Sequence, residues 1–142
     1  MGKNKLSPGK KAKRTGQWAK IMTKWLISFS TKGRKKWHFV SFEGSKGGES
    51  TGIVDFIAIR RNHKPKSLPF KKGDLFEIIL IQVKGGSASV PTPKEINRLN
   101  KVGKYYHAKY IILSEWQKGK SPKLYKLKSK LWEETTLKEA FG

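Results

Sequence analysis

The chain contains no cysteine and few acidic residues. Its 142 residues include 32 Lys and Arg but only 10 Asp and Glu, so the formal net charge is +22. Without cysteine it has no disulfides, thiolate nucleophiles or Cys-type zinc sites. It also has no apolar run of about 18 residues, the length that a membrane-spanning helix needs. Because the N-terminus lacks the apolar stretch of a signal peptide, we expect a cytoplasmic protein without membrane association.

Positive charge is what the chain has in abundance. A net charge of +22 repels itself unless a polyanion neutralises it, which favours nucleic acid as the partner. The chain is nevertheless apolar enough to fold, because 36% of its residues are hydrophobic and five are Trp. Residues 1–15 hold almost nothing apolar and are expected to form a basic flexible arm. Residues 16–142 are expected to form a single domain.

Hydrophobic spacing predicts the order of the helices and strands. Six apolar residues share one face of a first helix and are expected in the core: Trp18, Ile21, Met22, Trp25, Leu26 and Phe29. Aromatic and β-branched runs predict a hairpin of strands at 37–42 and 53–59, then a central strand at 75–84. Thr92 and Pro93 mark the start of a second helix. Strands at 110–113 and 123–127 follow, and a tail of helical character completes an α/β domain.

Asp55 stands out as an acid in an apolar stripe. Alternation along 53–59 places it on the same face as Ile57 and Ile59. A buried carboxylate must be hydrogen-bonded, paired or bound to a metal, and a salt bridge to a lysine is the purely structural alternative. On the next strand, Gln82 and Lys84 share one face. If the two strands are neighbours, these three side chains converge beside the Gly85–Gly86 turn, where the backbone leaves room for a phosphate.

The three residue types suit phosphodiester hydrolysis. Asp55 would hold Mg²⁺, and Gln82 would supply a neutral oxygen ligand or position water. Lys84 would orient the nucleophile or stabilise the charge that develops on the phosphate.

The segments GIVDFIAIR and LFEIILIQVKGGSA, inside an αβββαβ order, resemble the PD-(D/E)XK nuclease superfamily, which includes restriction endonucleases and archaeal Holliday junction resolvases. The resemblance covers residues 17–115. Asp55 matches the first acid of the motif, Gln82 its second acidic position and Lys84 its lysine. Gln82 departs from the usual Glu or Asp, as in the Mrr-like restriction endonucleases, which have a Gln-x-Lys form.

This resemblance implies a restriction-endonuclease-like core with a mixed central sheet flanked by helices. It also implies an endonuclease that depends on Mg²⁺, with Mn²⁺ as a substitute, and a homodimer. Because the chain has little surface for a reading domain, structure-specific cleavage of branched or duplex DNA is favoured over sequence-specific cleavage. The alternative is a non-catalytic nucleic-acid-binding protein with a degenerate nuclease fold, which the missing carboxylate at Gln82 would suit.

Further residues are expected to assist. Many relatives supply another acid from the first helix or strand. The helix from Trp18 to Phe29 has none, so Glu49 and Glu43 are the candidates for a further metal ligand, with Glu49 preferred. The loop after the Asp55 strand returns to the Gln82 strand, so we expect it near the site. The expected phosphate contacts are Lys10, Lys11, Lys13, Arg14, Arg60, Arg61, Lys64, Lys66, Lys71 and Lys72.

Overall fold

The computed structural model describes residues 8–31, 36–41, 54–62, 76–85 and 91–142, with side chains from Thr15 onward. The helices are α1 (Pro8–Ser30), α2 (Pro93–Tyr105) and α3 (Leu137–Phe141). The strands are β1 (His38–Ser41), β2 (Phe56–Arg61), β3 (Phe76–Gly85), β4 (Tyr110–Trp116), β5 (Lys123–Lys128) and β6 (Leu131–Thr135).

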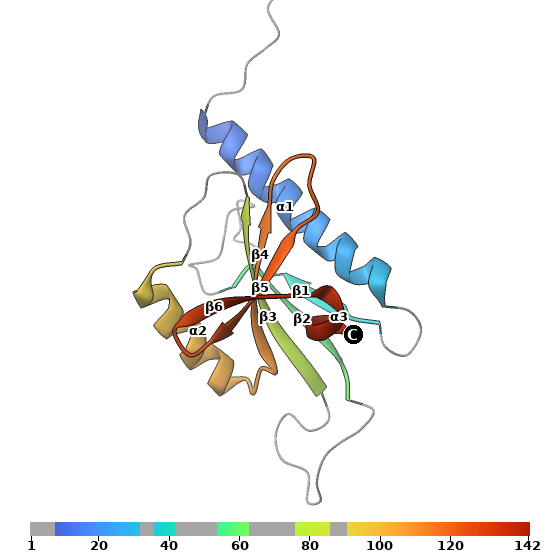
Figure 1. Ribbon diagram of the computed structural model, residues 1–142, viewed down its shortest axis with the longest axis vertical. Coiled ribbons are helices and arrows are strands. Elements are labelled where there is room, and N and C mark those ends of the chain that lie inside the picture. The colour runs from blue at the N-terminus through green and yellow to red at the C-terminus, as the bar shows by residue number, and fades with distance from the viewer. Residues whose placement is uncertain (1–7, 32–35, 42–53, 63–75, 86–90) are drawn as a thin grey trace, which may run out of the picture.

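These strands form one mixed sheet in the order β1-β2-β3-β4-β5-β6. β3 and β4 are parallel, and the other neighbouring pairs are antiparallel. Parallel neighbours need a crossover, which α2 supplies. α1 and α3 cover one face of the sheet and α2 covers the other (Figure 1). The predicted α/β class, the αβββαβ order and the mixed sheet flanked by helices are confirmed.

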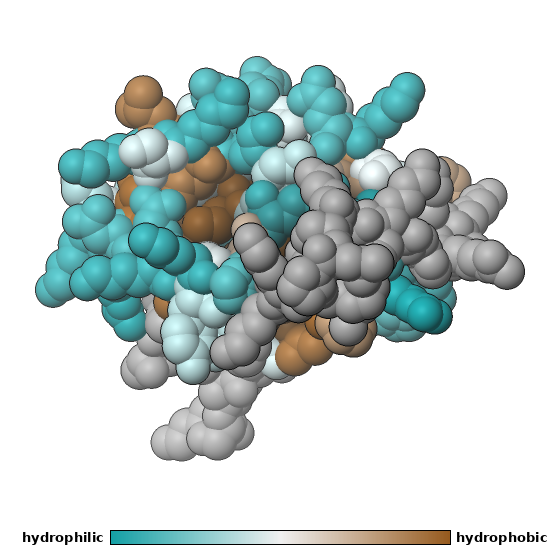
Figure 2. All heavy atoms as spheres, turned by 90° about the horizontal axis from the view of Figure 1, so that it is seen from below, coloured by the Kyte–Doolittle hydropathy of each residue, from teal (hydrophilic) through white to brown (hydrophobic). Residues whose placement is uncertain are grey.

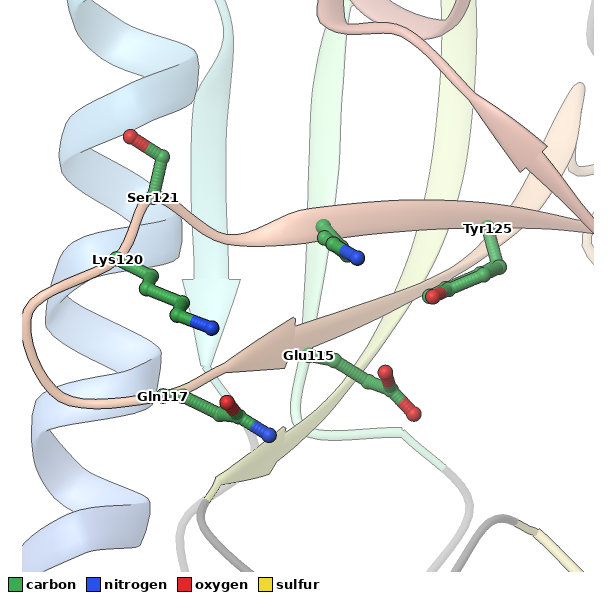
Figure 3. Close-up of a pocket in the computed structure, with 6 residues that line it drawn as sticks. Glu115, Gln117, Lys120, Ser121 and Tyr125 are labelled. Atoms are coloured by element: carbon green, nitrogen blue, oxygen red, sulfur yellow. The ribbon is translucent and has the colours of Figure 1, made fainter.

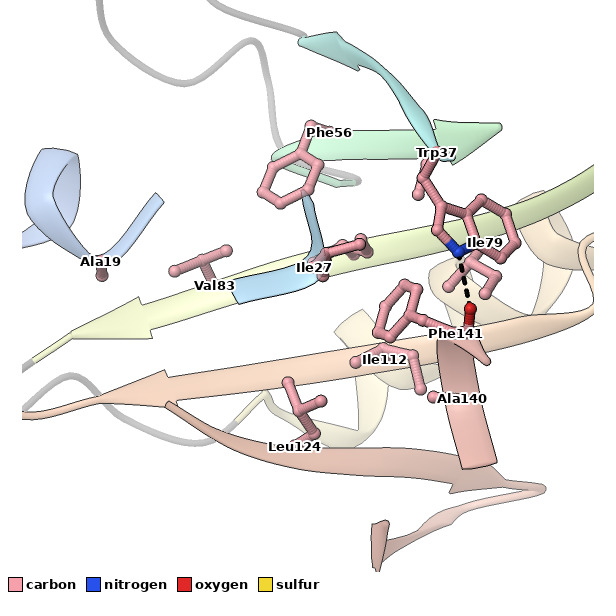
Figure 4. Close-up of a cluster of buried hydrophobic side chains, with 12 residues drawn as sticks. Ala19, Ile27, Trp37, Phe56, Ile79, Val83, Ile112, Leu124, Ala140 and Phe141 are labelled. Carbon is pink, nitrogen blue, oxygen red and sulfur yellow. Dashed lines mark hydrogen bonds between the residues drawn. The ribbon is translucent and has the colours of Figure 1, made fainter. Parts of the chain in front are cut away.

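The main core lies between the sheet and α1 with α3. Ala19 and Ile27 of α1 join Val83 and Ile112 of the sheet in one buried cluster (Figure 4). The Trp37 indole closes its far end by donating a hydrogen bond of 2.8 Å to the Phe141 carbonyl. We call this side of the sheet the α1 face. Alternation along the strands assigns the intervening residues to the opposite side, the α2 face.

The helix α2 packs closely on the α2 face. Its start follows the sequence prediction, because the Thr92 side chain accepts a hydrogen bond from the Glu95 amide and Pro93 follows it. Gly103 is buried, and a Cβ there would lie 2.9 Å from Ile111 Cδ1. A larger residue at 103 would force the Ile111 side chain to shift, so glycine suits this close contact between α2 and β4.

Residues 8–15, which the composition assigns to a flexible arm, are helical in the structure. α1 begins at Pro8, so this basic segment is the first part of a helix of 23 residues. Proline suits the first turn of a helix, and Lys, Arg and Ala are good helix formers. The composition indicates that these residues are not buried. A helix can nevertheless include unburied residues in its first turns when its later turns pack against the rest of the protein.

The predicted burial of the aromatic face of α1 is also wrong. The buried residues are Ala19, Thr23 and Ile27, spaced four apart, whereas Trp18 is 47% exposed and Trp25 54%. The hydrogen bonds of the Thr23 hydroxyl explain in part why this side of α1 is the buried one. It donates to the Ala19 carbonyl and shares a 2.8 Å hydrogen bond with Ser114 on β4.

The C-terminal tail differs from its prediction as well. Its first half forms β6, which pairs with β5, and only its last residues form α3. In the described part of the chain, no helix has both the length and the apolar character to cross a membrane. Figure 2 shows one face of the molecule, where hydrophilic side chains cover much of the described surface.

Candidate active site

Asp55 lies directly before β2, at a local break in the pairing with β3. Its amide donates to the carbonyl of Ile81 at 3.1 Å, although Ile81 is already the register partner of Phe56. Two residues of one strand thus face one residue of the other, as in a β-bulge. A bulge re-aims a side chain, which explains why Asp55 does not follow the alternation that the sequence predicted with Ile57 and Ile59.

The Asp55 carboxylate is buried, and partners on β3 and on α1 contact it. Its Oδ2 accepts a hydrogen bond of 2.6 Å from the backbone amide of Val83 on β3. Its Oδ1 lies 3.5 Å from the Lys20 ammonium of α1, and the Asp55 side chain is 3% exposed. The salt bridge to a lysine, which the sequence left open as the structural alternative, is therefore present.

Gln82 and Lys84 flank the residue that holds Asp55. Val83 faces α1, and a Cβ on Gly85 would lie 3.2 Å from Ala19 Cβ, so both Gln82 and Lys84 project from the α2 face. The Oε1 atom of Gln82 is buried and has no hydrogen-bond partner within the described structure. None of the ion pairs between described residues involves Lys84.

The three predicted residues therefore meet at one end of the β2–β3 pair, but not on one face. Asp55 is bonded to the main chain between Gln82 and Lys84, whereas its cationic partner approaches from the α1 face. For the oxygens of Asp55 and Gln82 to share one cation, the carboxylate must leave Lys20 and turn toward the α2 face.

The donor chemistry at this point fits a hard divalent cation. A carboxylate and an amide oxygen are ligands that Mg²⁺ accepts. Gln82 Oε1 is a buried acceptor without a donor, and the Lys20 ammonium already provides a positive charge beside Asp55. Among the described residues, no three His, Asp or Glu side chains form a group that could hold a metal.

A polar row extends the site across the α2 face. Lys84 pairs in register with Glu115 on β4, and Glu115 pairs with Lys123 on β5. Because β3 and β4 are parallel, the turn that follows β4 lies at the same end of the sheet as Lys84. Sequence reasoning missed Glu115, although the alternation of Ile111, Leu113 and Glu115 repeats that of Ile78, Leu80 and Gln82.

The end of this row opens into a small pocket between β4 and β5. Six residues line it: Glu115, Gln117, Lys120, Ser121, Lys123 and Tyr125 (Figure 3). Burial, followed by the charges of Glu115 and Glu134 and a hydrogen bond to Glu115, raises the pKa of Tyr125 above its usual value of 10.0. Tyr125 thus stays protonated and donates to Glu115, which fixes that carboxylate beside two lysines.

Arg60 has a structural role that removes it from the expected phosphate contacts. Its guanidinium donates to Glu77 and to the carbonyls of Phe141 and Gly142, and it stacks 4.1 Å above the Trp37 ring. Arg60 is 9% exposed. The prediction failed because charge in a sequence does not reveal that alternation turns Arg60 into the core, beside Phe56 and Ala58.

The basic loop after β2 does not begin near the site. β2 runs away from Asp55, and Arg61, which is exposed, pairs with Phe76 at the far end of the hairpin. Phe76 lies six positions before Gln82 on β3, which is about 20 Å of strand. The two strand ends that this loop joins are therefore the ends opposite to the site, while the loop itself lies outside the described residues.

Several predicted residues lie outside the described residues, namely Glu43, Glu49, Lys64, Lys66, Lys71 and Lys72. Lys10, Lys11, Lys13 and Arg14 belong to the N-terminal turns of α1. These turns precede Thr15, whose side chain would be 3.2 Å from a Cβ on Gly85. The basic start of α1 thus lies toward the same end of the sheet as Lys84.

Comparison with known proteins finds a likeness among solved structures. No protein-family model and no curated protein matches the chain. Among solved structures, the Holliday junction resolvase Hjc of Archaeoglobus fulgidus, an archaeal hyperthermophile, is similar with a TM-score of 0.48 and 11% identity. The match covers 82% of this chain and 83% of the resolvase. Since a likeness of this size carries no argument about chemistry, function must be argued from the residues.

Proposed function

We propose that the chain is a metal-dependent endonuclease that hydrolyses phosphodiester bonds of DNA. The observation that carries this proposal is the buried, unpartnered Gln82 Oε1 next to the Val83 amide that holds Asp55. A buried acceptor without a donor costs free energy, so its retention calls for an explanation. A cation shared with Asp55 explains it and gives the site a function.

The roles follow from the side chains. Asp55 and Gln82 would hold Mg²⁺ or Mn²⁺, which when bound polarises a phosphate oxygen and lowers the pKa of water. Lys84, whose ammonium lies outside the ion pairs between described residues, would donate to the phosphate oxygen where negative charge grows. The α2 face beside Lys84 would receive the scissile phosphate, with Lys123 and Lys120 toward the neighbouring backbone.

The substrate is proposed to be branched DNA, with duplex DNA as the comparison. The net charge of +22 supplies sequence-independent affinity for the backbone. The described part of the chain is one layered α/β unit, with no second domain that reads bases. Recognition of a DNA shape is therefore favoured over recognition of a sequence.

A cleavage assay tests this proposal. Junction, flap and linear duplex DNA are incubated with Mg²⁺ or Mn²⁺ and the full chain. We expect cleavage by the wild type and a loss of about 100-fold or more for Asp55→Ala and Lys84→Ala. Lys126→Ala is the matched control and retains activity. Lys126 lies on β5, which β3 and β4 separate from β2 in the sheet. Equal cleavage by all four proteins, or activity that persists in EDTA, would refute the proposal.

The second candidate is a DNA-binding protein that uses the same fold without chemistry. The Lys20–Asp55 ion pair favours it, because Lys20 satisfies the buried carboxylate without a metal. This alternative predicts DNA binding that is identical in Mg²⁺ and EDTA, with no cleavage of any substrate.

A further inference from the structure

The pocket between β4 and β5 contains a carboxylate in an otherwise cationic stretch of the sheet. Glu115 lies in register between Lys84 and Lys123, yet none of the ion pairs between described residues involves Glu115. Its neighbour Ser114 bonds to α1, and Leu124 packs into the core of the α1 face. Alternation therefore turns both Glu115 and Lys123 to the α2 face, where the carboxylate can act as a hydrogen-bond acceptor.

A tyrosine holds this carboxylate in place. The Tyr125 hydroxyl donates to Glu115, and its proton is retained because burial and the nearby acidic charges raise the pKa of Tyr125. Both side chains reach into the same pocket, one from β4 and one from β5 (Figure 3). A carboxylate has about four acceptor positions, so one hydrogen bond leaves others open. Glu115 is thus a fixed acceptor that can select a ligand with N–H donors.

The pocket has room for one planar ring. Its volume is about 140 Å³, whereas one water occupies about 30 Å³ and a cavity of about 150 Å³ can enclose a benzene molecule. A single ion would leave most of this volume unfilled. The amide of Gln117 and the hydroxyl of Ser121 also line the pocket, so a ring that carries polar groups suits it better than an apolar ring.

The acid also separates a base from a phosphate as the occupant. A carboxylate repels a phosphate, so it is costly on a surface that meets DNA unless it accepts hydrogen bonds from donors. Nucleobases carry N–H donors on their edges, whereas the phosphates of the backbone carry only acceptors. Lys120 and Lys123 line the same pocket and can contact the phosphates on either side. Glu115 therefore suits the base of a nucleotide, and the two lysines suit its backbone.

We infer that this pocket holds an unpaired cytosine of the bound DNA. The amino group of cytosine is a donor that a Glu side chain accepts in a recurring pairing. Thymine presents a carbonyl oxygen at that position, which the carboxylate repels, and purines have two rings. The inference rests on the DNA partner of the proposed function, but not on its metal or its cleavage step.

The position of the pocket suits a base at a branch in the DNA. Glu115 is one strand away from Lys84, about 5 Å, so the base lies close to the proposed scissile phosphate. Moving a base out of the stack costs least when that base is already unpaired. Unpaired bases also expose the edges that pairing hides. One base contact at a branch therefore adds to the recognition of shape without a second domain that reads duplex DNA.

Fluorescence anisotropy of the full chain in EDTA tests this inference without any cleavage. The probes are four DNA duplexes that are identical except for one unpaired nucleotide, which is dC, dT, dA or dG. We expect the wild type to bind the dC probe about tenfold more tightly than the dT probe. Glu115→Gln should bring this ratio close to one, because the Gln amide can also donate to the thymine carbonyl. Glu134→Gln removes the same charge from β6, outside the pocket, and should keep the ratio.

Comparing the probes on one protein cancels the change in net charge, and circular dichroism verifies that each variant is folded. Equal wild-type affinities for the dC and dT probes, or tighter binding of a purine probe, would overturn the inference. So would a dC preference that persists in Glu115→Gln or is lost in Glu134→Gln. DNA cleavage without a dC preference would refute the inference alone, whereas a dC preference without cleavage would refute the proposed nuclease and support the pocket.

Discussion

Lys20 and Asp55 form an ion pair at the proposed metal site. The pair joins α1 to the start of β2, and the Lys20 side chain is 18% exposed. Removing Lys20 takes away one positive charge beside the buried Asp55 carboxylate, which destabilises the fold. Within the proposed function, Lys20 therefore holds Asp55 in the absence of metal and competes with the metal for it.

The variant Lys20→Met separates these two effects. We expect it to lower the free energy of unfolding in EDTA by about 1–3 kcal/mol, because a nearly buried carboxylate loses its ion pair. Mn²⁺ should bind more tightly than to the wild type and restore the lost stability. Thermal denaturation with and without Mn²⁺ measures both. Lys24→Met is the control on the same helix, and equal Mn²⁺ stabilisation of all three proteins contradicts the competition.

Glu77 couples stability to pH at the far end of β3. Burial acts to raise its pKa, but the hydrogen bond and charge of Arg60, together with Lys109, hold the pKa below 4.5. A lowered folded-state pKa adds stability above the unfolded-state value, and this stability is lost as pH falls through the folded-state value.

Glu77→Gln should therefore destabilise the protein at neutral pH and much less in acid. We expect a loss of about 1–2 kcal/mol near pH 7, reduced from the range for charged hydrogen bonds because Glu77 is partly exposed. The difference from wild type should shrink as pH falls below 4.5. Urea unfolding at several pH values measures it, and a pH-independent difference would show that the pairing with Arg60 is not its cause.

At the scale of elements, β4 and β5 bring cations toward the proposed site, whereas Arg61 lies at the far end of the β2–β3 hairpin. Lys123 lies in register with Glu115, which lies in register with Lys84. The turn between β4 and β5 adds Lys120. These two lysines are thus better placed than Arg61 for a phosphate next to the scissile one.

The double variant Lys120→Ala/Lys123→Ala should weaken DNA binding in EDTA and lower the slope of log K against log salt by about 2 for duplex DNA. The reason is the loss of two phosphate contacts. Lys101→Ala/Lys130→Ala removes the same charge from α2 and the β5–β6 turn and should leave the slope nearly unchanged. Titrations by fluorescence anisotropy decide between them, and equal slopes for the two double variants would exclude the pocket from the DNA path.

The elements also show what the sequence can and cannot predict. The order of the elements, the α/β class and most strand positions can be predicted from the hydrophobic period and from local signals such as Thr92 and Pro93. These signals act within a few residues of the chain. The helix α1 carries two overlapping stripes, Ala19–Thr23–Ile27 and Trp18–Trp25–Phe29. Hydropathy alone predicts that the stripe with the larger side chains is buried. In the structure α1 lies so close to Gly85 and Ser114 that the stripe with the smaller side chains packs against the sheet instead.

The site could be predicted in part for the same reason. Alternation correctly puts Gln82 and Lys84 together on one face, since it acts within one strand. Alternation fails for Asp55, because both Asp55 and Phe56 pair with Ile81. That pairing depends on the neighbouring strand and cannot be read from one strand alone. Lys20 and Glu115 come from other elements, so only the fold reveals that they are neighbours of the motif residues.

For the whole molecule, one excess of charge has two opposite consequences. The net charge of +22 favours a polyanion and opposes self-association. The charge is not spread evenly over the described surface, because the exposed residues of α1 from position 17 onward carry none.

Calorimetry of Mn²⁺ binding tests the central claim most directly, because it needs neither substrate nor turnover. We predict that the wild type binds Mn²⁺, that Asp55→Asn loses this binding, and that Gln82→Glu binds about tenfold more tightly through its added carboxylate. Gln117→Glu adds the same charge nearby and should match the wild type. Undiminished Mn²⁺ binding by Asp55→Asn, or equal affinities for Gln82→Glu and Gln117→Glu, would contradict a metal site at Asp55 and Gln82.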